Sequence, residues 1–298
     1  MEILRAVEEL RQWSRVNRRS GETIGLVPTM GALHAGHARL IEQAVRETDC
    51  AVVSIFVNPI QFNDPRDYGQ YPRTLVEDAA LCGRLGAPIV FAPAGEEMYP
   101  RPQQSFVEVQ GVTESLCGQF RPGHFRGVAT VVTKLFQILR PDLAFFGEKD
   151  YQQLAVIRRL VRDLNMPVQV VGITTVREPD GLAMSSRNRR LTPAERVLAP
   201  QLYQALLTAR RLIVAGERNP AEIKSAVAHF IGNTPEIRLE YFDLVDPDTI
   251  QPVPVVNAPV RAALAAWLGE TRLIDNILCI PRVLKRFKPT IHAPRASS

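Results

Sequence analysis

The sequence has few cysteines and no long apolar run. Its four cysteines are dispersed over 298 residues without a Cys-x-x-Cys pair, which argues against a disulfide framework or a zinc ribbon and fits a reducing cytoplasm. No stretch of about eighteen uncharged apolar residues occurs, and the N-terminus lacks the apolar core of a signal peptide. We therefore expect a cytoplasmic protein without a membrane-spanning helix or a membrane partner.

The charge of the sequence is only modestly unbalanced, with a formal net charge of +5. Much of the excess lies in residues 281–298, where basic residues meet no acidic one. A basic tail can touch nucleic acid, but aromatic stacking partners are nearly absent from it. We therefore predict a solvated, disordered tail and no nucleic-acid partner.

Strand-like and helix-like segments alternate over residues 1–176. Such alternation is typical of βαβ units, in which helices cover both faces of a parallel sheet. We therefore predict an α/β fold there, a Rossmann-like doubly wound parallel sheet. The expected strands are Thr23–Val27, Ala51–Val57, Ile89–Ala92, Asp142–Phe146 and Val168–Val176, with a weaker edge candidate at Phe106–Val109. The expected helices are an amphipathic one over residues 2–15, then Ala38–Thr48, Leu75–Leu85, Val128–Leu139 and Tyr151–Leu164.

The pattern changes after a turn signal at Arg177–Gly181, which marks a candidate hinge. Helices are expected first, a long one from Pro193 to about Ala215 and a shorter one over Ala221–Ile231. Strand candidates follow at Leu239–Val245, Val260–Trp267 and Thr271–Ile280. This order predicts a smaller C-terminal α+β domain over residues 177–280.

The most informative stretch is Val27–His37, where a His-Ala-Gly-His unit lies between an apolar strand and a helix. Free backbone N–H groups and the helix dipole make such a position an anion site. His34 and His37 can face one side of the first helical turn and stabilise charge on a phosphate. A metal pair would need a third protein ligand, and incidental histidines are the plain alternative. The unit favours a site that acts on phosphate.

Two further polar clusters, Asn58–Gln61 and Gly147–Asp150, directly follow predicted strands. Open α/β sheets bind ligands at the carboxyl ends of their strands, so we expect the three clusters to converge. Lys149 would act there as a point charge on a phosphoryl group, although alone it also fits a loop salt-bridge cluster. Gln153, one helical turn beyond, could hydrogen-bond a small substrate.

Other segments carry weaker signals. The loop Met184–Arg187 has two hydroxyls and an arginine that could close over a triphosphate. Tyr71 belongs to a loop whose polar residues also fit turn chemistry. Asp78 could bind Mg²⁺ or lie on a solvated helix face. The basic, glycine-rich loop Arg121–Gly127 could contact a substrate or a partner subunit.

In this order, the motifs resemble the pantothenate synthetase (pantoate–β-alanine ligase) family of the His-x-Gly-His nucleotidylyltransferase superfamily. The resemblance fades after Ile280. It covers Pro28–His37, Ser54–Phe62, Tyr71–Thr74, Leu116–Leu135, Phe146–Leu154, Met184–Thr192 and Arg272–Asn276. It implies that ATP and (R)-pantoate give pantoyl adenylate and pyrophosphate, and that β-alanine then attacks the adenylate to give pantothenate and AMP. It also implies Mg²⁺, a cytoplasmic homodimer and a second domain that partly covers the site.

The resemblance also assigns roles to residues. His37 would be the catalytic histidine, and His34, Lys149 and Arg187 would act on the phosphates. Gln61 and Gln153 would hold pantoate, with Gln61 also near β-alanine. To these we add Asn58 and Tyr71 as substrate contacts and Asp78 as the candidate Mg²⁺ ligand. The nucleotide would be contacted by Met30, Gly31, Ala32, Leu33, His34, Ala35, Gly36, His37, Gly147, Glu148, Lys149, Asp150, Val176, Met184, Ser185, Ser186 and Arg187.

Two other functions stand as alternative hypotheses. Another small-molecule nucleotidylyltransferase would share the paired histidines but would have no use for Gln61 and Gln153 as a carboxylate-and-hydroxyl pocket. A non-catalytic nucleotide-binding module would bind ATP without turnover, which leaves the paired histidines without a purpose. A class I aminoacyl-tRNA synthetase is disfavoured because the chain has no room for an anticodon-binding domain.

Overall fold

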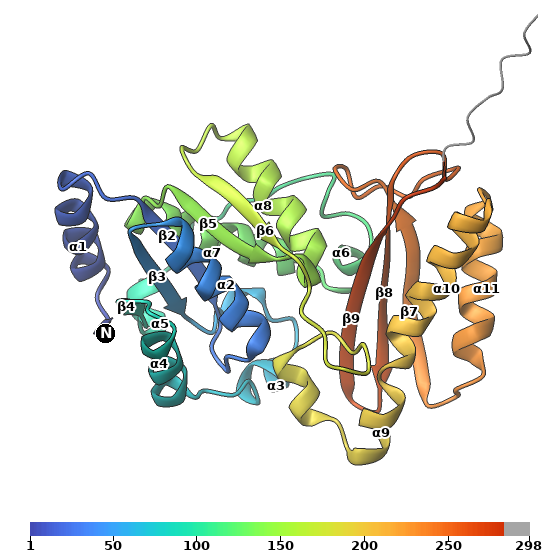
Figure 1. The fold of residues 1–298 in the computed structure, drawn as a ribbon. Coiled ribbons are helices and arrows are strands. Elements are labelled where there is room, and N and C mark those ends of the chain that lie inside the picture. The colour runs from blue at the N-terminus through green and yellow to red at the C-terminus, as the bar shows by residue number, and fades with distance from the viewer. Residues whose placement is uncertain (283–298) are drawn as a thin grey trace, which may run out of the picture.

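Two sheets organise the protein in the computed structural model, which describes residues 1–282 (Figure 1). The first sheet has six parallel strands: β1 (Glu2–Leu4), β2 (Ile24–Thr29), β3 (Cys50–Ile55), β4 (Ile89–Phe91), β5 (Leu143–Gly147) and β6 (Gln169–Ile173). Their order in space is β1-β4-β3-β2-β5-β6. The predicted basic tail, from residue 283 onward, lies outside the described residues.

Helices cover both faces of this sheet because its strands are apolar on both sides. Leu26 on β2 packs into one core, and its neighbour Val27 packs into the other. The first face is covered by α1 (Val7–Arg19), α7 (His124–Leu139) and α8 (Tyr151–Asp163). The opposite face is covered by α2 (Ala35–Glu47) and α4 (Leu75–Arg84). The predicted doubly wound parallel sheet is therefore confirmed.

Short helical turns occupy the connections near the carboxyl ends of the strands. They are η1 (Pro59–Gln61), α3 (Pro65–Gly69), α5 (Gly95–Met98), α6 (Cys117–Phe120), η2 (Glu148–Asp150) and η3 (Ser186–Arg190). Three of them, η1, η2 and η3, contain residues that the sequence analysis selected. Of the helices formed by the described residues, none combines the length and the apolar character that a membrane crossing requires.

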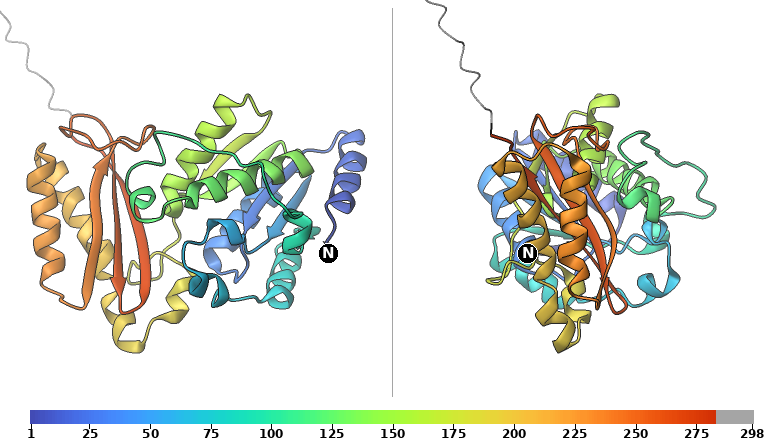
Figure 2. Two further views of the ribbon diagram at one scale, coloured as in Figure 1. Left: turned by 180° about the vertical axis from the view of Figure 1, so that it is seen from behind. Right: turned by 90° about the vertical axis from the view of Figure 1, so that its right-hand side faces the viewer.

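The predicted sheet in the C-terminal part of the chain is present, and its strands are antiparallel. It consists of β7 (Ile237–Val245), β8 (Val260–Leu268) and β9 (Thr271–Cys279). One face packs on α10 (Gln201–Ala215) and α11 (Pro220–Gly232), which lie on the outer side of the molecule (Figures 1 and 2). On the inner face, the guanidinium of Arg261 lies 3.6 Å from the ring centroid of Tyr151 on α8. The second sheet thus borders the first unit directly.

The structure corrects three element predictions. The N-terminal helix begins only at Val7, because Glu2–Leu4 pairs in parallel with β4 as an edge strand. The predicted long helix from Pro193 is interrupted before Pro200, giving α9 (Pro193–Leu198) and α10, since proline has no N–H to continue the ladder. Phe106–Val109 is not a strand. The boundaries at residues 176 and 280, and the hinge, stay predictions.

Candidate active site

The main pocket lies where the chain reverses its direction across the first sheet. From β2 the chain winds outward to β3 and β4, and then returns to place β5 on the other side of β2. The carboxyl ends of β2 and β5 therefore flank a crevice, the usual ligand position in open α/β sheets. The pocket there has a volume of about 210 Å³, and all three predicted polar clusters contribute to its lining.

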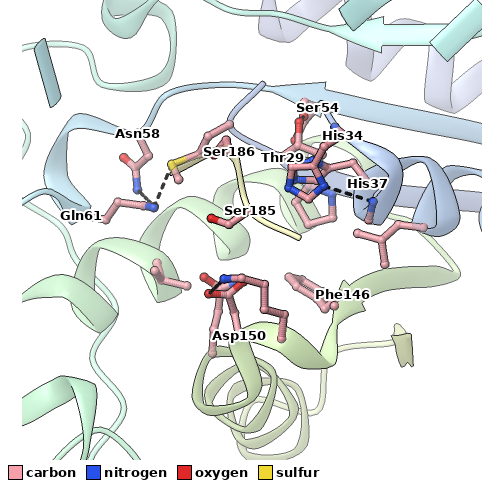
Figure 3. Close-up of a pocket in the computed structure, with 18 of the residues that line it drawn as sticks. Thr29, His34, His37, Ser54, Asn58, Gln61, Phe146, Asp150, Ser185 and Ser186 are labelled. Carbon is pink, nitrogen blue, oxygen red and sulfur yellow. Dashed lines mark hydrogen bonds and ion pairs between the residues drawn. The ribbon is translucent and has the colours of Figure 1, made fainter. Parts of the chain in front are cut away.

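The paired histidines lie at one end of this pocket (Figure 3). The Gly36 N–H donates to Nδ1 of His34 at 3.1 Å, and the His34 N–H donates to Nδ1 of His37 at 3.3 Å. Because Nδ1 accepts in both rings, each neutral imidazole carries its proton on Nε2. Burial, then the charge of Lys149, lowers the pKa of His34 to about 4. Burial and the neighbouring His34 lower the pKa of His37 to about 3, so both rings are neutral N–H donors at pH 7.

The turn that leads into the histidines is held by a buried carboxylate. Gly31 and Ala32 both adopt left-handed backbone angles, with φ of 82° and 51°, a conformation that costs energy for alanine. Asp78 accepts the N–H groups of Ala32 and Leu33 at 2.8 Å each and the hydroxyl of Thr74 at 3.1 Å. Since its oxygens are occupied and its side chain is buried, this geometry favours a positioning role for Asp78 over the Mg²⁺ ligand expected from the sequence.

Gln61 lies at the opposite end of the pocket and is held on both sides of its amide (Figure 3). Its Nε2 donates to the sulfur of Met30 at 3.1 Å, and its Oε1 accepts from Nδ2 of Asn58 at 2.9 Å. Asn58 is fully enclosed and also accepts from the Tyr99 hydroxyl at 2.8 Å. Asn58 therefore orients Gln61, and because it also lines the pocket, its contact with the substrate stays a prediction.

Helix α7 closes this end of the pocket. It approaches η1 through Gly127, where an added Cβ would lie 2.6 Å from the carbonyl oxygen of Ile60. Nδ1 of His124 donates to the carbonyl of Gln61 at 2.8 Å, and Arg121 donates to the same oxygen at 3.2 Å. Arg121 and His124 line the pocket, so the loop that the sequence left open faces this cavity. The apolar wall comes from Val128, Val131, Val132 and Leu135.

The loop Met184–Arg187, which is expected to bind phosphates, is held in place by an acidic residue that the sequence analysis did not select. Asp67 on α3 forms ion pairs with Arg187 and Arg190, each at 2.9 Å. The hydroxyl of Tyr71 lies 3.3 Å from that of Ser186. Asp67 had no signal, because it lies in a loop with several charged residues and its partners come from far along the chain.

Lys149 reaches the pocket from η2, and the second sheet fixes the backbone that carries it. Nδ2 of Asn276 on β9 donates to the carbonyls of Glu148 and Lys149, at 2.9 Å each. The ammonium of Lys149 lies 3.8 Å from the carboxylate of Asp150. Asn276 belongs to a motif matched in the sequence, but its role in holding the backbone of η2 is visible only in the fold.

The structure brings together most of the residues selected from the sequence. The pocket is lined by Met30, His34, Gly36, His37, Asn58, Gln61, Tyr71, Gly147, Lys149, Asp150, Gln153, Val176, Met184, Ser185, Ser186 and Arg187. Gly31, Ala32, Leu33, Ala35, Glu148 and Asp78 shape the surrounding turns and do not line it. Thr29 and Ser54 also line the pocket; both belong to the motifs matched in the sequence, but neither was given a role because each resembles an ordinary strand residue.

Comparison with known proteins identifies relatives over almost the entire chain. The family model described as pantoate-beta-alanine ligase matches residues 2–278. Pantothenate synthetase from Moorella thermoacetica is 50% identical over 278 residues, covering 93% of this chain and 98% of the relative. The Geobacter sulfurreducens enzyme of the same name is 50% identical over 276 residues, covering 93% of this chain and 98% of the relative.

Solved structures agree with the sequence relatives. A crystal structure of pantothenate synthetase from Thermus thermophilus superposes with a TM-score of 0.87 at 47% identity, covering 93% of this chain and 99% of that one. Pantoate-beta-alanine ligase from Francisella tularensis, complexed with beta-gamma ATP and beta-alanine, superposes with a TM-score of 0.78 at 36% identity, covering 93% and 97%.

Proposed function

The chain belongs to the pantoate-beta-alanine ligase family, and we propose that it makes pantothenate from (R)-pantoate, β-alanine and ATP in two steps. First, a carboxylate oxygen of pantoate attacks the α-phosphorus of ATP, an O–P bond forms, and the bond to the leaving pyrophosphate breaks. Then the amine of β-alanine attacks the acyl carbon of pantoyl adenylate, an amide bond forms, AMP leaves, and the amine releases a proton.

The observation that carries this proposal is the pair of neutral imidazoles opposite Gln61 in one pocket. The Nε2–H groups of His34 and His37 stabilise the charge that develops on the α-phosphate during attack, and Lys149 adds a fixed positive charge. Gln61 and Gln153 supply amide groups for the pantoate hydroxyls and carboxylate. A wall of valines suits the branched carbon skeleton of pantoate.

Mg²⁺ belongs to the proposal as the ion that accompanies ATP, neutralising phosphate charge. The described residues form no group of three His, Cys, Asp or Glu side chains that could hold a metal alone. Mg²⁺ typically needs only one or two carboxylates together with phosphates and waters. Asp150 fits that need, because it is the one carboxylate among the described residues that line the pocket. The homodimer and the cytoplasmic location expected from the sequence are also part of this proposal.

The first step is tested by ATP–pyrophosphate exchange with pantoate present and β-alanine absent. We expect label exchange that depends on pantoate. The His37→Ala variant should lower this exchange by roughly 100- to 1,000-fold, the usual cost of removing one such donor. His229→Ala, which alters an exposed histidine on α11, should exchange normally. A wild-type protein that binds ATP without pantoate-dependent exchange would rule out the adenylate route.

A further inference from the structure

Arg121 carries a positive charge that the described part of the chain does not neutralise. Its guanidinium hydrogen-bonds the Gln61 carbonyl at 3.2 Å and the His124 ring at 3.3 Å, and it also interacts with the side chain of Cys117. Burial lowers the pKa of Arg121, the side chain of Cys117 acts against this, and the charges of Arg187 and Arg272 lower the pKa further. Those two are ion-paired, whereas Arg121 makes no ion pair with a described carboxylate. A partly buried, unpaired arginine is costly unless a ligand supplies the anion.

The neighbouring histidine does not replace the missing anion. Burial, followed by the charge of Arg121, lowers the pKa of His124 to about 3. With Nδ1 donating to Gln61, the neutral ring presents Nε2 to Arg121 as an acceptor. This contact orients the guanidinium without cancelling its charge. The remaining N–H groups of Arg121 therefore face an anion of the substrates, and a planar guanidinium matches both carboxylates and phosphates.

The hydrogen bonds of Arg121 are made with Gln61 and His124 and not with the paired histidines, although the charge of Arg187 reaches it. It hydrogen-bonds the main chain of Gln61, which lies at the far end of the pocket from His34 and His37 (Figure 3). It also lines a second, smaller cavity of about 60 Å³, and besides Arg121 the two cavities share His124, Lys149, Asp150 and Gln153. Arg121 therefore borders space on a second side, outside the main pocket that an adenylate would fill.

Pantoate and β-alanine each have a carboxylate, and only the carboxylate of β-alanine is unchanged by the proposed reaction. The pantoate carboxylate must attack phosphorus, and a tight guanidinium contact would weaken it as a nucleophile. The carboxylate of β-alanine takes no part in bond formation and can be held throughout. We propose that Arg121 binds the carboxylate of β-alanine and so selects an amino acid as the nucleophile of the second step. This assignment rests on the proposed function.

The test uses Arg121→Met, which removes the charge and keeps an apolar stem. We expect the KM for β-alanine to rise by ~100-fold, as for loss of a charge-assisted pair. Pantoate-dependent ATP–pyrophosphate exchange should fall far less, by about tenfold at most, because the first step loses only the hydrogen bond from Arg121 to the Gln61 carbonyl. Arg121→Lys should restore part of the β-alanine affinity. Arg126→Met, at an exposed arginine in the first turn of α7 that stacks on Phe106, is the matched control.

A second readout separates recognition from damage to the fold. Hydroxylamine has no carboxylate and traps pantoyl adenylate as the hydroxamate. We expect hydroxamate formation by Arg121→Met to fall no further than exchange does, so the preference for β-alanine over hydroxylamine collapses in the variant. An unchanged preference, in which the reaction with β-alanine falls only as much as exchange and hydroxamate formation, overturns the assignment. Absence of exchange in the wild type would instead overturn the proposed function.

Discussion

Single residues of this site work through the backbone around them as much as through the ligand. Backbone N–H groups donate to Nδ1 of both His34 and His37, and this leaves the proton of each neutral ring on Nε2. No other side chain is needed to fix this tautomer. Asn58 sets the orientation of the Gln61 amide through a contact of 2.9 Å. Asp78 holds the left-handed turn before the histidines. The donors that would meet phosphate are therefore positioned before a ligand arrives, which is what electrostatic catalysis requires.

Asp78→Asn tests the positioning role against the Mg²⁺ role at the scale of one residue. The amide offers one acceptor where the carboxylate offers two, so a buried N–H loses its partner. We expect the free energy of unfolding in urea to fall by about 1–3 kcal/mol, while the Mg²⁺ concentration for half-maximal activity stays unchanged. Glu77→Gln, on the exposed side of the same helix turn, should alter neither quantity. A large rise in the Mg²⁺ requirement with normal stability would support metal ligation.

At the scale of elements, the site depends on how closely α7 approaches η1. Gly127 permits this approach, since a Cβ would meet the backbone of Ile60 and Gln61 at 2.6 to 2.7 Å. The same helix provides His124, whose ring holds the Gln61 carbonyl. The periodicity of residues 128–139 predicted the helix but not its true start at His124. The missing turn is polar and glycine-containing, and its packing, not its propensity, makes it helical.

Gly127→Ala should shift η1 and with it the amide of Gln61. Alanine is the better helix former, so local propensity alone predicts no harm. We expect instead a KM for pantoate raised roughly 10- to 100-fold, the penalty for a displacement of about 1 Å in a catalytic site. Gly232→Ala on α11, where a Cβ would meet nothing within 4 Å, serves as the control. Normal pantoate kinetics in Gly127→Ala would show that the backbone yields without moving Gln61.

At the scale of the whole molecule, the second sheet takes part in building the site. Arg177 and Asp275 form a buried ion pair at 2.6 Å that joins the segment after β6 to β9. Beside it, Asn276 binds the backbone of η2, which carries Lys149. Contacts separated by more than a hundred residues therefore set the position of a phosphate-binding lysine. Asp275 and Asn276 also line the smaller cavity beside Lys149, so we expect these contacts to limit the access of water to a reactive acyl adenylate.

Asn276→Ala should loosen η2 and open the site to water. We expect a higher KM for ATP and more AMP released per pantothenate formed, because part of the adenylate is hydrolysed before β-alanine attacks. Loss of the two donors should lower activity by about tenfold. Measuring AMP and pantothenate in the same reaction gives the ratio directly. Asn257→Ala, in an exposed loop of the same sheet unit, should release as much AMP per pantothenate as the wild type. A wild-type ratio of AMP to pantothenate in Asn276→Ala would contradict this role.

The local chemistry of the chain determined much of this outcome. Apolar strands, alternating helices and polar clusters after strand ends predict the doubly wound sheet and its ligand edge, since burial and hydrogen bonding act on short segments. The motif residues His34, His37, Gln61 and Lys149 follow from the same patterns. Tertiary structure alone decided which of the selected residues face the cavity and which brace it. Asp78, Asn58 and Asp67 acquire their partners only when segments distant in sequence pack together.

The unpaired charge of Arg121 shows the same division most clearly. The sequence places an arginine in a basic loop with many acidic residues elsewhere in the chain, and nothing local says whether one of them will reach it. In the folded molecule Arg187 forms an ion pair with Asp67, and Arg272 forms one with Glu240. Arg121 instead lies beside a neutral histidine and a carbonyl group. Electrostatic pairing depends on distance through space, and that distance exists only in the folded molecule.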